Sequence, residues 1–210
     1  MSLEELREQN KRLVTEKALE CFIQNGISNT RISDIAAASG LTQRSVFRYF
    51  ASKDDIIIAA AFCYWERAKA HIARELEKHT GAAQTGIEQI RIILQSYANM
   101  LFTDPEGIRF SLDAEVALHS AGKNAHVVNR PPERYESHTG PLSQAVLRGL
   151  ADGTVDPDAD VRQLYYNAYD SILGMMQRMS LGVPSVNELD AHERLRAMCE
   201  MFTQEFAAKS

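Results

Sequence analysis

The side chains best suited to binding lie between Leu41 and Lys53, where the sequence reads LTQRSVFRYFASK. The charged residues of this stretch are Arg44, Arg48 and Lys53, and no acid lies among them. A run of cations creates a local positive field, which suits a polyanion such as the phosphate backbone of DNA. The alternative is an ordinary solvated face, because exposed cations are common on helices.

The groups between these cations can also distinguish bases. A guanidinium such as Arg44 can bond both O6 and N7 of guanine, and an amide such as Gln43 can make the equivalent pair with adenine. Ser45 can contact either a base or a phosphate. The hydroxyl and cationic groups near the two ends of the stretch are of the kinds that bond phosphates, and these are Thr42, Arg48, Tyr49 and Lys53.

Two short helices must hold these side chains in place. Residues 32–38 read as the first helix, Gly40 supplies the permissive backbone of a turn, and Thr42 can cap a second helix with its hydroxyl. The apolar side chains expected to pack inward are Leu41, Val46 and Phe50. The side chains left to face outward or to lie at the rim are Gln43, Arg44, Ser45, Phe47, Arg48 and Tyr49. The pattern predicts a helix-turn-helix unit.

The remaining sequence also reads as helices, so the predicted fold class is all-α. We expect an N-terminal three-helix helix-turn-helix domain over residues 1–55 and a C-terminal helical domain over 80–210, linked by a helix of about 53–79. Three other helices are expected at about 3–24, 85–102 and 105–120. A further helix should end at 152, with a break at Gly140-Pro141. The last two helices should run from Asp156-Pro157 to about 182 and from Ser185 to about 208.

Composition limits the possible classes of protein. The chain has 210 residues, 45% of them hydrophobic, and a formal net charge of -5. The first 55 residues hold eight basic and eight acidic side chains, so the excess of acid lies in the remainder. The apolar runs are too short to cross a bilayer and the N-terminus is charged, so we expect a cytoplasmic protein with no membrane partner. Three scattered cysteines favour reduced thiols, and redox sensing is left open.

A set of residues in the first quarter of the chain resembles the N-terminal domain of TetR-type transcriptional regulators. These residues are Val14, Ala18, Phe22, Gly26, Thr30, Asp34-Ile35-Ala36, Gly40-Leu41-Thr42, Phe47-Arg48-Tyr49-Phe50 and Ser52-Lys53. The resemblance implies that the helix after Thr42 lies in the major groove. It also implies a homodimeric repressor that binds an inverted-repeat operator in double-stranded DNA and is released by a small-molecule effector.

Two positions depart from the family pattern. Phe47 stands where tyrosine is usual, so one phosphate hydrogen bond is expected to be missing. Arg31 stands where a capping hydroxyl is frequent, and it can add a basic phosphate contact.

The resemblance extends to dimerisation and effector binding. It implies that the last two helices, about 158–182 and 186–208, pair with their copies in a second subunit, with Gly174 permitting close approach; packing within one chain is the alternative. The effector candidates are Tyr97, Met100, Leu101, Phe110, Asp113, His119, Tyr166, Tyr169, Asp170 and Met176. Aromatic and methionine side chains at helical spacing are often simply core. The two carboxylates can recognise a cation, or pair with arginines such as Arg109 or Arg178.

No catalytic signature is found. The chain has no Glu-x-x-His pair, no His-Glu-x-x-His motif, no Gly-rich phosphate loop and no Gly-x-Ser-x-Gly elbow. We therefore expect no enzyme, no catalytic residue, no metal and no cofactor. A helical protein-interaction module whose helix-turn-helix no longer binds DNA remains the alternative function.

Overall fold

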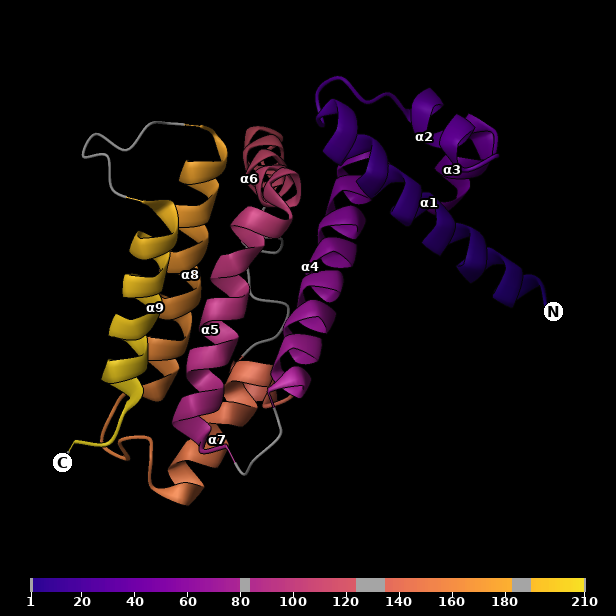
Figure 1. The fold of residues 1–210 in the computed structure, drawn as a ribbon. Coiled ribbons are helices and arrows are strands. Elements are labelled where there is room, and N and C mark those ends of the chain that lie inside the picture. The colour runs from indigo at the N-terminus through magenta and orange to yellow at the C-terminus, as the bar shows by residue number, and fades with distance from the viewer. Residues whose placement is uncertain (1, 80–83, 124–134, 183–189, 210) are drawn as a thin grey trace. The chain divides into compact units, whose positions relative to one another are not determined.

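The computed structural model describes residues 2–79, 84–123, 135–182 and 190–209 (Figure 1). The elements in these ranges are α1 (Leu3–Asn25), α2 (Ile32–Ala38), α3 (Gln43–Tyr49), α4 (Lys53–Lys78), α5 (Gly86–Thr103), α6 (Pro105–Ser120), the 3-10 helix η2 (Tyr135–Ser137), α7 (Pro141–Asp152), α8 (Val161–Ser180) and α9 (Ala191–Phe206). The described residues contain no strand, only an isolated bridge between Val155 and Ala207. The all-α prediction is confirmed.

The chain divides into two compact units, each described by itself. The first unit comprises Met1–Glu66 with Glu106–Asn129, and the second comprises Arg67–Pro105 with Arg130–Ser210. The helix α6 therefore shares a unit with α1, α2 and α3. The two domains expected from the sequence, over 1–55 and 80–210, stay a prediction.

The core of the first unit lies where α1 meets α2 and α3. One face of α1 is buried, through Val14, Ala18, Leu19 and Phe22. Ile35 of α2 and Val46 of α3 are each fully buried. The helix α2 has the predicted bounds of residues 32–38. Because seven-residue helices are not stable in water alone, this shared core holds both of them in place.

An aromatic contact joins α6 to the rest of the first unit. The ring of Phe110 on α6 stacks on that of Phe22 on α1, with centroids 6.1 Å apart and planes at 8°. Tyr64 on α4 meets the same ring edge-on at 6.0 Å. All three side chains are buried. The helix α6 thus contributes to the core that lies beneath α1.

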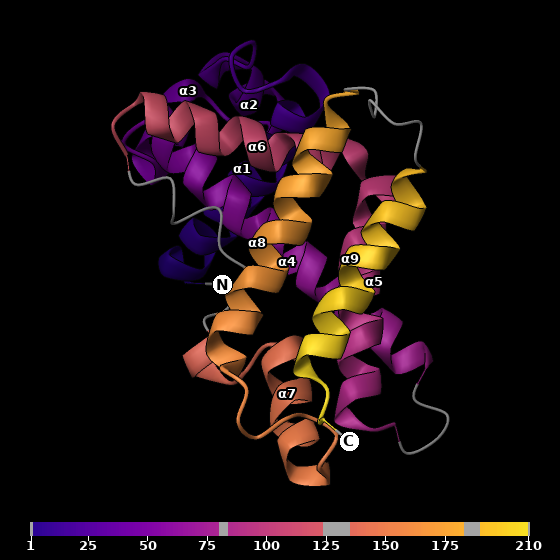
Figure 2. The same ribbon diagram turned by 90° about the vertical axis from the view of Figure 1, so that its left-hand side faces the viewer.

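The second unit is built around α5, which packs against α7, α8 and α9. Its buried face includes Ile90, Leu94 and Tyr97. Figure 2 shows α8 and α9 side by side, as their mutual packing requires. The hydrophobic period of α5 explains this arrangement, because a helix with a wide apolar face must be covered by several neighbours.

The first turn of α5 crosses α7 at very short range. A methyl group placed on Gly86 would lie 2.1 Å from the backbone nitrogen of Gly149. The end of α7 also satisfies free amides of α5, since the Asp152 carboxylate accepts from the Gly86 N–H at 2.8 Å and the Thr154 hydroxyl accepts from the Ile87 N–H at 3.2 Å. Thr85 and Glu88 complete this end with the predicted capping box.

Two predicted helix starts differ from the structure. The helix α8 begins at Val161, capped by Asp160, rather than at Asp156-Pro157. The Asp156 carboxylate instead accepts from the Asp158 N–H in a local turn, while the Asp156 N–H donates to the Phe206 carbonyl. The helix α9 begins at Ala191, capped by Asp190, and the predicted start at Ser185 lies outside the described residues.

The predicted break at Gly140-Pro141 is the start of α7. Proline occupies the first turn of this helix, where its missing N–H costs nothing. Gly153, in the left-handed conformation with φ of 75°, ends the helix as predicted.

We predict that Gly86→Ala lowers the free energy of unfolding by about 1–3 kcal/mol, because the added methyl overlaps backbone atoms that cannot yield without moving α7. Chemical denaturation measures the change. Gln95→Ala, at an exposed position of α5, is the control and should change stability by less than about 0.5 kcal/mol. Equal stability of the two variants would contradict the close crossing.

Candidate nucleic-acid interface

A short hydrogen-bonded cap fixes the start of α3. Gly40 turns the chain with a φ of 66°, which a residue with a side chain rarely adopts. The Thr42 hydroxyl then accepts from the Ser45 N–H at 3.1 Å, and the two hydroxyl oxygens lie 3.0 Å apart. Thr42 is thus the predicted N-cap of the helix.

The two faces of α3 differ as the sequence predicts. Val46 and Phe50 are buried and Leu41 is half-buried. The exposed side chains are Gln43, Arg44, Phe47 and Arg48, and those of Ser45 and Tyr49 are half-buried. The helix therefore presents polar, cationic and aromatic groups on the side opposite its core.

The two arginines of α3 are held differently. The Arg48 guanidinium lies 3.4 Å from the Ser45 hydroxyl oxygen and 5.6 Å from the centroid of the Tyr49 ring, which places it in a cation–π contact. Arg44 has no hydrogen bond or ion pair with any residue that the structure describes. Its five N–H donors are thus free for a ligand, which is what a bidentate base contact requires.

Lys53 has a partner that the sequence did not indicate. Its ammonium group donates to the Ile27 carbonyl oxygen at 2.5 Å, which ties the start of α4 to the loop after α1. Burial lowers the pKa of Lys53, against the opposing effect of Asp54 and Asp34. An ammonium group has three donors, so this bond leaves others for a phosphate. The contact spans 26 residues of sequence and has no local signal.

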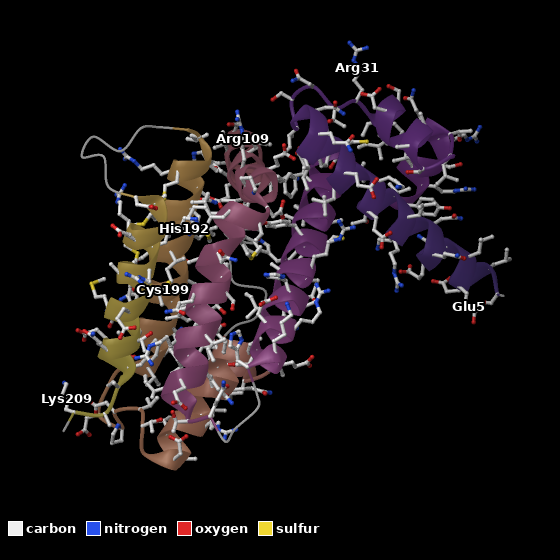
Figure 3. The ribbon with its side chains drawn as sticks, viewed as in Figure 1. Glu5, Arg31, Arg109, His192, Cys199 and Lys209 are labelled. Carbon is white, nitrogen blue, oxygen red and sulfur yellow. The ribbon has the colours of Figure 1, made fainter. Side chains whose placement is uncertain are left out.

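Arg31 lies just before α2, and its side chain extends away from the ribbon (Figure 3). It supplies no capping oxygen. The Asp34 carboxylate instead accepts from the Arg31 N–H at 2.7 Å. One half of a capping box thus replaces the hydroxyl that the family pattern expects, and the Arg31 guanidinium remains exposed.

The predicted effector residues fall into two groups, one in each unit. In the second unit Tyr97, Met100, Leu101, Tyr169 and Met176 are buried, Tyr166 is half-buried and Asp170 is exposed. In the first unit Phe110 is buried, Asp113 is half-buried and His119 is exposed.

Tyrosines form a continuous cluster in the second unit. The Tyr169 ring contacts those of Tyr97 and Tyr165, with centroids 4.9 and 5.1 Å apart. Tyr165, which the sequence prediction omitted, also contacts the ring of Tyr135 at 5.4 Å. The signal for Tyr165 was present, because it lies four residues before Tyr169 on the apolar face of α8.

A polar cluster lies beside these rings. The Tyr166 hydroxyl donates to the Glu136 carboxylate at 3.0 Å and accepts from the Tyr135 N–H at 3.2 Å. Arg162 donates to the other Glu136 oxygen at 2.5 Å. The Arg162 guanidinium, followed by a backbone hydrogen bond and then the Tyr166 hydroxyl, lowers the pKa of Glu136 to about 2. The cluster attaches η2 to α8.

Each unit also has a surface groove. The groove of the second unit, about 440 Å³, lies along the end of α4, α5 and α9 and is lined by residues that include Gln95, Asn99, Phe102, His192 and Arg196. None of the predicted effector residues lines it. The groove of the first unit, about 500 Å³, lies along the end of α1, the following loop and α6, and is lined by residues that include Phe110 and Asp113.

Cys199 and Cys21 are poorly suited to reaction, and the described residues offer no metal site. Burial raises the pKa of Cys199 to about 12, and its thiol donates to the Leu94 carbonyl at 3.4 Å. Burial also raises the pKa of Cys21. These thiols are protonated near neutral pH, which makes them poor nucleophiles. The described ranges contain no group of three or more side chains able to hold a metal ion, and none of their helices is long and apolar enough to span a bilayer.

The exposed face of α3 above its packed core, together with a family match, defines a DNA-binding transcriptional regulator. Residues 14–60 match the family model described as bacterial regulatory proteins, tetR family. The N-terminal segment of the chain is thus of the TetR type. The chain is 22% identical over 149 residues to the fatty acid metabolism regulator protein of Bacillus subtilis (strain 168), which covers 71% of this chain and 72% of that protein.

Solved structures share the fold over nearly the whole chain. A TetR transcriptional regulator from Chloroflexus aurantiacus J-10-FL superposes with a TM-score of 0.65 at 19% identity, over 98% of this chain and 100% of that one. The transcriptional regulator FadR from Bacillus subtilis, in complex with stearoyl-CoA, gives a TM-score of 0.63 at 18% identity, over 92% of this chain and 98% of that one. At these identities the likeness establishes the fold.

We predict that Arg44→Ala and Lys53→Ala weaken DNA binding in different ways. Arg44→Ala should relax the preference for one base pair by about 1–3 kcal/mol, because a bidentate base contact is lost. Lys53→Ala should weaken all sequences alike and reduce the slope of log affinity against log salt by about one. Binding titrations on matched and mutated duplexes at several salt concentrations measure both effects.

Lys53→Ala should also lower the free energy of unfolding by about 1 kcal/mol, because the bond to the Ile27 carbonyl is removed. Arg44→Ala is the control for stability, since Arg44 is exposed. Equal losses on every sequence from both variants would refute the division of roles.

Proposed function

We propose that the protein is a homodimeric repressor that binds an inverted-repeat operator and is released by a small-molecule effector. The single observation that carries the proposal is the unengaged Arg44 guanidinium on the exposed face of α3, with Gln43 beside it. The DNA-contacting set would be Arg31, Thr42, Gln43, Arg44, Ser45, Phe47, Arg48, Tyr49 and Lys53. The protein-interaction alternative gives no reason for a stretch from Leu41 to Lys53 that carries cations and no acid.

The dimer would form through α8 and α9, the pair that faces the viewer in Figure 2. The side chain of Met201 on α9 is 51% exposed, and Ala197 lies one turn before it on the same face. On α8, a methyl group added to the exposed Gly174 would have no neighbour within 4 Å, so the backbone of a second subunit could approach there. Exposed apolar and small side chains on two adjacent helices suit an isologous interface.

The effector would bind in the second unit and have a substantial apolar body. The interior of that unit presents Tyr97, Tyr169 and Met176, with few charged groups among its buried residues. The stearoyl-CoA in the FadR structure has the same character, a long apolar chain with a polar end. The effector would act by changing the separation of two recognition helices, which must lie about 34–36 Å apart to occupy successive major grooves.

Selection of bound duplexes from a random or genomic pool tests the DNA-binding proposal. We expect an inverted repeat with half-sites about one turn of DNA apart, and an affinity that falls steeply with salt. The selected duplex then serves to screen effectors, and long-chain acyl-CoA should release the protein whereas free coenzyme A should not. Weak binding without any preferred sequence would reject the repressor proposal in favour of the protein-interaction module.

A charged substitution tests the dimer. Met201→Arg should weaken the dimer about tenfold or more, because it would bury an unpaired cation at the interface. Analytical ultracentrifugation measures the dissociation constant. Leu147→Arg on α7, where the native side chain is 41% exposed, is the matched control and should leave the dimer intact. A Met201→Arg protein that dimerises like the wild type would place the interface elsewhere.

A further inference from the structure

Phe47 is an aromatic side chain exposed in the middle of the recognition helix. It is 51% exposed, whereas Val46 next to it is fully buried. Its ring has no aromatic or cation–π partner among the residues that the structure describes. The core of the first unit therefore does not account for the presence of phenylalanine at this position.

The neighbours of Phe47 limit what it can contact. Gln43 and Arg44 lie four and three residues earlier, so all three side chains project from the same side of α3. The Arg48 guanidinium is engaged with the Ser45 hydroxyl and the Tyr49 ring. Phe47 is thus the one large apolar side chain on the exposed face of α3.

A phenyl ring cannot bond a phosphate or the polar edge of a base. The only apolar group that a base pair presents in the major groove is the 5-methyl of thymine. From Phe47, therefore, we infer that α3 reads a thymine methyl, and that this contact sets the base preference of one position in each half-site. The inference rests on the proposed function, since it requires α3 to lie in the major groove.

The position of that thymine follows from helix geometry. Phe47 lies about 4.5–6 Å along the helix axis from Arg44 and Gln43, at 1.5 Å per residue. Base pairs rise about 3.4 Å each. The thymine should therefore lie about one or two base pairs from the base that Arg44 contacts, on whichever strand brings its methyl toward the ring.

Replacement of thymine by deoxyuridine removes the methyl group without changing the protein or the base pairing. In the selected operator, each thymine of both half-sites is replaced in turn, and the dissociation constant is measured at fixed salt. We expect one position per half-site at which the replacement weakens wild-type binding about fourfold, the effect of one methyl group withdrawn from an apolar contact. In Phe47→Ala the same replacement should have no effect, while the Arg44-dependent preference persists.

Phe62→Ala is the matched control, because Phe62 is 47% exposed on α4 in the same unit and lies outside α3. It should keep the wild-type response to deoxyuridine. A wild-type protein that binds its operator but responds to no replacement, or a Phe47→Ala protein that responds as fully as the wild type, would overturn the inference alone. A wild-type protein that selects no duplex would overturn the proposed function and this inference with it.

Discussion

A recognition helix of seven residues cannot hold its own shape in water. Formation of the first helical turn fixes several backbone dihedrals for a single hydrogen bond, and α3 is too short to recover that cost. Its conformation depends on the burial of Val46 and Phe50 beneath it and on the Thr42 cap at its start. The exposed side chains of α3 are thus positioned by the buried side chains of its other face and by the cap at its start. The bond from Lys53 to the Ile27 carbonyl adds a second attachment just beyond α3.

The features predicted correctly are those that depend on nearby residues. The bounds of α2, the Thr42 cap and the glycine after α7 all follow from side chains within a few positions of the feature itself. The prediction for the start of α8 was wrong. Asp156-Pro157 has the form of a helix start, but the Asp156 N–H donates to the distant Phe206 carbonyl. Hydrogen bonds between residues distant in sequence have no local sequence pattern, and the Lys53 bond was missed for the same reason.

The candidate binding residues also divide into those that nearby sequence predicts and those that depend on residues distant in sequence. Periodicity separates the two faces of α3, so the exposed set could be named from the sequence. It also indicates that Tyr97 and Tyr169 point inward, yet inward-facing aromatics either fill a core or line a cavity, and spacing alone does not distinguish these cases. The grooves depend on where helices distant in sequence meet, and side chains such as His192 and Asn99, which line one of them, have no motif.

The contacts of Phe110 bear on how separable the DNA-binding segment is. Its ring completes a core to which α1 contributes Phe22 and α4 contributes Tyr64. A fragment that ends before α6 would leave these two rings uncovered, and a chimera that takes its first helices from one regulator and α6 from another would pair surfaces that did not evolve together. Exchange of DNA specificity among such proteins therefore requires either that residues 106–120 be transferred with the N-terminal helices, or that only the exposed side chains of α3 be changed.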